Sequence, residues 1–198
     1  SKGYAEALVD ETPESDPSQR FLEIIHRHSM QMERLVNDLL RLARLDAGQE
    51  LPEFSTCDAA SLIESVVRDF EPAAAVRGQQ LRVNITPRAR SLVVDPAKLH
   101  DILRNLVENA VHYTPHQGVI DVEADIVDGR YRLQIRDTGP GIPHDHIARV
   151  FERFYRVDKS RARPGGTGLG LAIVKNLVHV LGGEVRAANR SAGGAEFT

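Results

Sequence analysis

The sequence predicts an α+β fold with two parts, a helical segment over residues 1–48 and a mixed α/β domain over residues 53–198. In the first part, apolar residues recur with the alternating spacings of four and three that are typical of a coiled-coil helix. After Pro52, short strand patterns alternate with helical patterns. The chain has 198 residues, of which 41% are hydrophobic and 27% are charged, and its net charge is -3. This composition indicates a soluble globular protein and gives no basic field that would attract nucleic acid.

The helical segment has the pattern of a truncated hairpin. Asp16, Pro17 and Gln19 form a helix start signal, with an N-cap, a proline at the first helical position and an amide three residues after the cap. A helix from Pro17 to Ala47 is about 45 Å long at about 1.5 Å per residue, and residues 1–11 can cover only about a third of it. We therefore expect its apolar stripe to pair with upstream residues, with a second chain or with both, so that the hairpin forms a homodimer. The stripe consists of Phe21, Ile25, His28, Met32, Leu35, Leu39 and Leu42.

The mixed domain is expected to begin with a strand at 53–58 and a helix that Asp58 caps and Gly78 ends. Further on, Asp128 and Gly129 supply the tight turn of a β-hairpin. In chain order, the elements after the first helix are strands at 81–85 and 91–95, a helix at 96–113, the hairpin at 119–137, a loose stretch rich in Gly and Arg at 138–168, a helix at 169–181, and strands at 184–188 and 195–198.

A glycine-rich loop, PGGTGLG at 164–170, runs directly into an apolar helix pattern. Such loops often hold phosphates, because exposed backbone N–H groups and the helix dipole favour an anion. The two commonest phosphate motifs are excluded by spacing. A dinucleotide fingerprint that starts at Gly166 would need its third glycine at Leu171, and a P-loop would need Lys and Ser or Thr after Gly170.

Two further features involve oxygen-bearing side chains. Asp137 ends a predicted strand and is followed by glycines, an arrangement in which a carboxylate can accept a hydrogen bond from the exocyclic amine of adenine. Asn105 and Asn109 lie four residues apart, so both side chains emerge on one face of a helix. Oxygen ligands of this kind suit Mg²⁺ bound together with nucleotide phosphates.

Four motifs in this order resemble the N, G1, F and G2 boxes of sensor histidine kinases, within the wider group of gyrase-type and chaperone-type ATPases. They are DILRNLVENAVHYTP (101–115), DTGPGI (137–142), VFERFYR (150–156) and GGTGLGLAIVKNLV (165–178). The resemblance implies a two-layer α/β sandwich that binds ATP and Mg²⁺, and the catalytic part of a two-component kinase that passes the γ-phosphate to a histidine. It also implies a response regulator receiver domain as a partner and a cytoplasmic location, with an inner-membrane anchor in the parent protein left open.

The resemblance also assigns roles to residues. Asp137 is expected to bind adenine, with Gly139 and Gly141 making room for the ring. Asn109 is expected to hold Mg²⁺ and phosphate oxygens with help from Asn105, which makes these two the expected catalytic pair. The other expected cofactor contacts are His112, Tyr113, Phe154, Arg156, Lys159, Gly166, Thr167, Gly168, Leu169 and Gly170. Because many family members have Lys at the position of His112, a phosphate contact there stays open.

A lid is expected at about 144–165, with Phe151 and Phe154 as its apolar anchors. Its basic residues either face the triphosphate or the hairpin, or belong to a solvated loop. These residues are Arg156, Lys159, Arg161 and Arg163.

The phosphoacceptor sequence of the family, H-E-L-R-T-P-L, does not occur in the chain. Residues 3–8, GYAEAL, resemble the segment that comes directly after the acceptor sequence in the family, so we expect the acceptor just upstream and interpret His26 and His28 as bundle residues. Two rival functions stay open. A gyrase-type or chaperone-type ATPase would carry a Glu as general base near the position of Asn105, and a nucleotide-free scaffold would only dimerise.

Overall fold

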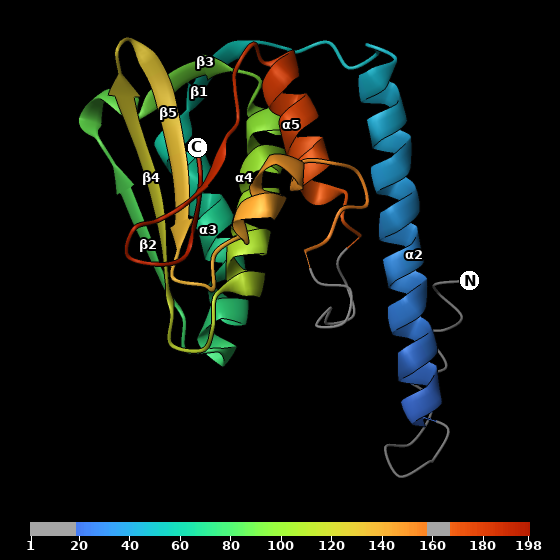
Figure 1. Cartoon of the computed structure of the whole chain (residues 1–198). Helices are drawn as coiled ribbons and strands as arrows, with labels where there is room; N and C mark the ends of the chain where they lie inside the picture. Colours follow the sequence, from blue (N-terminus) through green and yellow to red (C-terminus); the bar gives the residue numbers. More distant parts are fainter. Residues whose placement is uncertain (1–18, 158–166) are drawn as a thin grey trace.

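The computed structural model describes residues 19–157 and 167–198, and Figure 1 shows how they are arranged. One long helix, α2 (Gln19–Asp46), stands beside a domain in which helices cover a β-sheet. The expected helix start at Asp16 and the fragment at 1–11 lie outside the described residues.

The domain has two layers, a five-stranded sheet and three helices. The strand order is β2-β4-β5-β7-β6; β2 and β4 are parallel, and the other neighbours are antiparallel. The strands of this sheet are β2 (Gln80–Ile85), β4 (Val119–Val127), β5 (Arg130–Asp137), β6 (Ala187–Asn189) and β7 (Ala195–Phe197). The helices on one of its faces are α3 (Ala59–Val76), α4 (Pro96–Tyr113) and α5 (Gly170–Val180). This arrangement confirms the predicted fold class and the two-layer sandwich.

A second, two-stranded sheet pairs β1 (Ser55–Asp58) with β3 (Ser91–Val94) in antiparallel orientation at one end of the domain. Short 3₁₀ helices, η1 (Pro87–Ala89) and η2 (His144–Arg149), complete the described elements. The last hairpin differs from the prediction, because β6 is Ala187–Asn189 and not 184–188. Gly182, with a positive φ of 75°, and Gly183 form the turn after α5, and β6 starts at Ala187, where its pairing with Phe197 of β7 begins.

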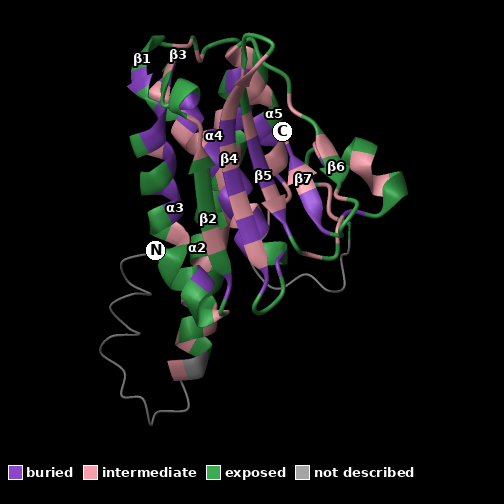
Figure 2. Cartoon of the chain, turned by 90° about the vertical axis from the view of Figure 1, so that its left-hand side faces the viewer, coloured by how far each residue is buried: buried purple, intermediate pink, exposed green. Residues whose placement is uncertain are grey.

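The core lies between the two layers, as the buried stripe along the strands and helices shows in Figure 2. Alternate residues of β4, such as Ile120 and Val122, are fully buried, whereas their neighbours are half-buried. On the helix side, Leu103 and Ile173 are buried to the same degree. Asp95 caps the start of helix α4, because its side chain accepts a hydrogen bond from the Lys98 N–H. The cap sets where the helix begins.

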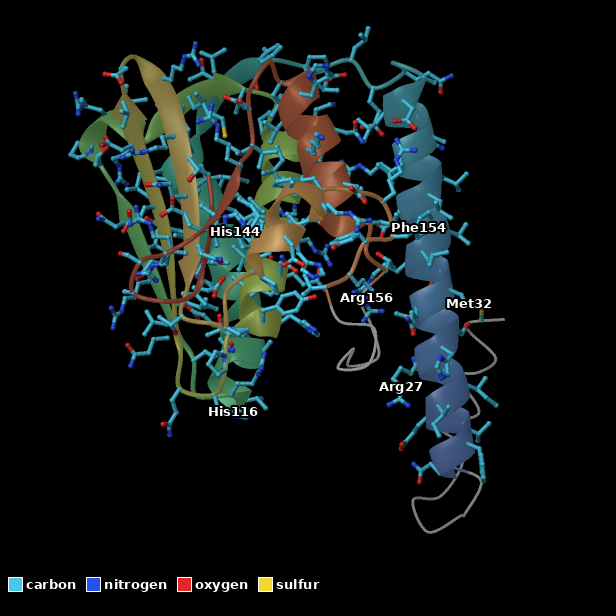
Figure 3. All side chains as sticks on the ribbon, viewed as in Figure 1. Arg27, Met32, His116, His144, Phe154 and Arg156 are labelled. Carbon is cyan, nitrogen blue, oxygen red and sulfur yellow. The ribbon has the colours of Figure 1, made fainter. Side chains whose placement is uncertain are left out.

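Helix α2 uses only its C-terminal turns to contact this core. Leu42 and Leu45 are buried, and α2 contacts α5. Further up the helix most of the predicted stripe is exposed, with Phe21 at 68% and Met32 at 63%, whereas Leu35 is half-buried. Met32 points away from the domain in Figure 3. Within the part of the chain that the structure describes, no helix has the length and apolar character needed to span a membrane.

Candidate functional site

Asp137 ends β5 as a buried carboxylate with only 3% of its surface exposed. Its Oδ1 accepts hydrogen bonds from the backbone N–H groups of Gly139, at 2.7 Å, and Ala195, at 3.2 Å. Burial raises the pKa of Asp137, while these two bonds and the charge of Arg190 act in the opposite direction. Both bonds end on Oδ1, so Oδ2 is the oxygen that can accept a hydrogen bond from a ligand.

Asn105 and Asn109 lie four residues apart on α4, as predicted, and both are half-buried. The Asn105 Nδ2 donates to the backbone oxygen of Asp101 at 2.8 Å. Its Oδ1 faces the start of α5, because a Cβ added to Gly170 would lie 2.8 Å from it. The amide oxygen of Asn105 therefore lies beside the helix N-terminus that the glycine loop enters.

The described part of the glycine loop is held against the F-box segment. The backbone N–H of Phe154 donates to the Gly168 oxygen at 2.9 Å. Gly168 has a φ of +72°, and a Cβ there would come within 3.0 Å of the Phe154 backbone. Thr167 accepts a hydrogen bond from the Leu169 N–H through its hydroxyl oxygen, at 3.2 Å. These contacts close the loop onto the N-terminus of α5, where backbone N–H groups can meet an anion.

The two predicted lid anchors differ in the structure. Phe151 is half-buried, and its ring packs edge-on against Phe197 with centroids 6.3 Å apart. Phe154 is 55% exposed and has a φ of 61°, and it is its backbone that contacts Gly168 of the glycine loop. Tyr155 fixes the same turn, since its hydroxyl is hydrogen-bonded to His146 Nδ1 and Arg149 lies 4.4 Å from its ring centroid.

The remaining expected cofactor contacts lie at the edges of this region. His112 and Tyr113 are exposed at the end of α4, with their rings edge-to-face at 4.9 Å. Arg156 is half-buried, on the side of the domain that faces α2 in Figure 3. Lys159 and Gly166, together with Arg161 and Arg163 of the predicted basic cluster, lie outside the described residues.

Polar side chains of α2 contact the same elements, which no motif in the sequence predicted. Arg34 pairs with Glu108 of α4 at 3.1 Å, and Arg41 pairs with Asp101 of α4. Asp38 accepts a hydrogen bond from the Thr167 hydroxyl at 3.2 Å. Burial raises the pKa of Asp38.

Farther along α2, Asp46 pairs with Arg153 at 2.6 Å. The helix therefore contacts α4, the F-box segment and the glycine loop together.

The C-terminal turn between β6 and β7 is a second feature that sequence reasoning missed. Asn189 and Arg190 hydrogen-bond to the loop that carries Asp137, and Gly194 packs against the Asp137 backbone. The one signal in the sequence was the pair Gly193–Gly194 between two short strands, which marks a turn but not what the turn contacts.

The comparisons with known proteins agree with this geometry. Residues 94–198 match the family described as histidine kinase-, DNA gyrase B-, and HSP90-like ATPase, and residues 2–48 match the His Kinase A (phospho-acceptor) domain. The phosphate regulon sensor protein PhoR of Pseudomonas aeruginosa is 38% identical over 178 residues, which is 89% of this chain and 40% of PhoR. The sensor histidine kinase WalK of Bacillus subtilis is 34% identical over 201 residues, which is 100% of this chain and 33% of WalK.

Among solved structures, full-length ShkA in complex with AMPPNP matches with a TM-score of 0.82 and 32% identity, over 98% of this chain and 40% of ShkA. The chain thus spans between a third and two fifths of these relatives. The division at residues 48 and 53 stays a prediction. A match over more than half of the chain identifies it as a member of the histidine kinase-, DNA gyrase B- and HSP90-like ATPases, in the branch of the two-component sensor histidine kinases.

Proposed function

We propose that this chain is the phosphoryl-donating part of a sensor kinase, which transfers the γ-phosphate of ATP to a histidine side chain. The observation that carries this proposal is the buried Asp137 carboxylate, whose Oδ1 is held by two backbone amides while Oδ2 can accept from a ligand. An adenine exocyclic amine is a donor that fits this acceptor. The AMPPNP complex of ShkA supports the same interpretation, since AMPPNP is an ATP analogue.

The residues present fit Mg·ATP. Asn109 and Asn105 supply amide oxygens on one face of α4, and Mg²⁺ prefers oxygen ligands shared with substrate phosphates. The loop from Thr167 to Gly170 enters the N-terminus of α5, where N–H groups and the helix dipole stabilise phosphate charge. When bound, Mg²⁺ would neutralise charge that develops during transfer. Lys159 and Gly166 remain predicted contacts.

Transfer to a side chain is favoured over hydrolysis because Asn105 carries an amide. An amide does not take a proton, so it cannot act as the general base that an attacking water needs. Its Nδ2 is also bound to the Asp101 backbone, which leaves it as a positioning group beside α5. Catalysis would then depend on orientation and charge neutralisation in line with a histidine nitrogen.

The partners in this proposal are a second copy of the chain and a response regulator receiver domain. The exposed stripe of α2 supports the homodimer, because Phe21, Ile25 and Met32 are each more than half exposed in a single chain. The match of residues 2–48 to a phospho-acceptor domain supports the relay. We expect the acceptor upstream of this chain, and a cytoplasmic location belongs to the same proposal.

Calorimetry with Asp137→Asn tests the nucleotide assignment. Loss of a charge-assisted hydrogen bond in a buried pocket costs about 1.5–3 kcal/mol, so ATP affinity should fall by tenfold or more. Asp128→Asn, in the turn between β4 and β5, is the matched control and should bind ATP as the wild type does. Asn109→Ala should remove the dependence on Mg²⁺. Wild-type protein that binds GTP as tightly as ATP would contradict the assignment.

Radiolabelled ATP tests the transfer. Residues 1–198 alone should remain unlabelled, and a longer protein that includes the upstream segment should be labelled on one histidine. Acid-labile phosphate on His26 or His28 of the 198-residue chain would show that the acceptor has been assigned to the wrong helix.

A further inference from the structure

The turn from Asn189 to Ala195, called here the C-terminal turn, lies against the loop that follows β5. The Asn189 side chain makes two hydrogen bonds to one residue of that loop. Its Oδ1 accepts from the Ile142 N–H at 2.7 Å, and its Nδ2 donates to the Ile142 oxygen at 2.6 Å. The amide thus pairs with Ile142 as a neighbouring strand would, which fixes the far end of the loop.

The near end of the same loop is fixed at Asp137. Arg190 donates to the Asp137 backbone oxygen at 3.0 Å, and the Ala195 N–H donates to Oδ1 at 3.2 Å. Gly194 makes the closest approach, since its φ is +92° and an added Cβ would lie 1.9 Å from the Asp137 oxygen. Both the main chain and one carboxylate oxygen of Asp137 are therefore held by a segment more than fifty residues away in sequence.

We infer that Asn189 and Arg190 are positioning residues that give the nucleotide site its preference for adenine. This inference rests on the proposed function. Adenine carries an amine donor at the position where guanine carries a carbonyl acceptor. A carboxylate distinguishes the two only while Oδ2 keeps a fixed direction, because hydrogen bonds weaken steeply with misalignment. The C-terminal turn supplies that direction by holding both ends of the loop.

The preference for ATP over GTP distinguishes an orienting role of the C-terminal turn from a role in stability alone. If the turn only stabilised the domain, its loss would lower the melting temperature and weaken every nucleotide by the same factor. If it orients Asp137, its loss should weaken ATP and leave the weak binding of GTP almost unchanged. Asn189 is exposed and Arg190 is half-buried, so truncating either side chain opens no cavity in the core.

The experiment measures the dissociation constants of ATP and GTP for the wild type, Asn189→Ala and Arg190→Met. Each variant loses one or two hydrogen bonds, so ATP affinity should fall about fivefold to tenfold, and the ratio of GTP to ATP dissociation constants should fall with it. The amide proton resonances of Gly139 and Ala195 should move in both variants, because both N–H groups donate to Oδ1 of Asp137.

Two variants serve as matched controls. Arg186→Met removes an exposed arginine bound to Glu184, and Asn176→Ala removes an amide that bonds to Ala172 within α5. Both should keep the wild-type selectivity. If the turn variants bind ATP and GTP more weakly by the same factor, or if both keep the wild-type preference for ATP, the inference is wrong and the proposed function is unaffected. A wild-type protein with no preference for ATP would overturn the proposed function as well.

Discussion

Asp38→Asn is expected to strengthen ATP binding, although Asp38 lies on α2 and outside the nucleotide motifs. The Asp38 carboxylate is half-buried and accepts a hydrogen bond from the Thr167 hydroxyl at 3.2 Å. Thr167 belongs to the loop that we propose wraps the phosphates. An ionised Asp38 therefore holds a negative charge beside the place where the triphosphate would bind. The asparagine keeps a hydrogen-bonding side chain of the same shape and removes the charge.

The size of the effect follows from Coulomb's law. Two unit charges about 6 Å apart repel by about 3 kcal/mol at an effective dielectric constant of about 20. Burial raises the pKa of Asp38, which favours its neutral form and so weakens the repulsion. The charges of Arg34 and Arg41 lower the same pKa, but as positive charges beside Asp38 they also cancel part of its field. We expect a net gain of about 1 kcal/mol, which is about a fivefold increase in ATP affinity at low salt.

Isothermal titration of the wild type and the variant with Mg·ATP at two salt concentrations measures this gain. Asp69→Asn is the matched control, because Asp69 is an exposed carboxylate on α3. The gain should shrink in part at high salt, because salt screens a half-buried charge less than an exposed one. Unchanged affinity in Asp38→Asn, or an equal gain in Asp69→Asn, would refute the reasoning.

Three further expectations concern stability, pH and exchange. Asp95→Ala should lower the free energy of unfolding by about 2–4 kcal/mol in urea titrations, because a buried N-cap that also binds the Glu53 N–H and Lys98 is lost. Burial alone would raise the pKa of Asp95, but these hydrogen bonds outweigh it and lower the pKa to about 2, so the wild type should lose this stability as pH falls from about 4 towards 2. ATP affinity should also fall in acid, at a pH above the usual range for an aspartate, because burial raises the pKa of Asp137 and its ionised form is the stronger acceptor for the amine; affinity that is constant down to the ordinary pKa of an aspartate would contradict this. In hydrogen exchange, residues 144–157 should be protected by an ATP analogue, and equal protection with and without it would count against a lid.

Much of the fold was predictable because its signals are local. Helix α4 combines an N-cap at Asp95, a proline at the first position and apolar residues at helical spacing, and the structure has it over the predicted residues, Pro96–Tyr113. The hairpin of β4 and β5 follows from the turn at Asp128 and Gly129, which both have positive φ values. Each signal depends on residues within one element, so no knowledge of the tertiary structure was needed.

The contacts of α2 and of the C-terminal turn were not predictable in the same way. Periodicity identified Leu42 as apolar, but it could not distinguish a hairpin partner from α5, against which α2 in fact packs. Asn189 is 47 residues from Ile142 in sequence, and Asp38 is 129 residues from Thr167. Neither pair has a motif, because a side chain that contacts a distant backbone or hydroxyl needs only suitable geometry, and many residue types can provide it.

The contacts between α2 and the sandwich domain determine how easily the two can separate. Arg34–Glu108 and Arg153–Asp46 are ion pairs with side chains between 42% and 55% exposed. Such pairs contribute about 0–1 kcal/mol each, because water and salt compete for both charges. The apolar part of the contact is confined to the last turns of α2, at Leu42 and Leu45. The less exposed pair of Arg41 and Asp101 and the hydrogen bond from Thr167 to Asp38 add to this contact, so separating the domain from α2 costs several kcal/mol, roughly half of the stability of an ordinary domain. In the proposed transfer, the glycine loop that contacts Asp38 in this structure would present a phosphate to a histidine, and weak contacts with α2 would let the domain move to do so.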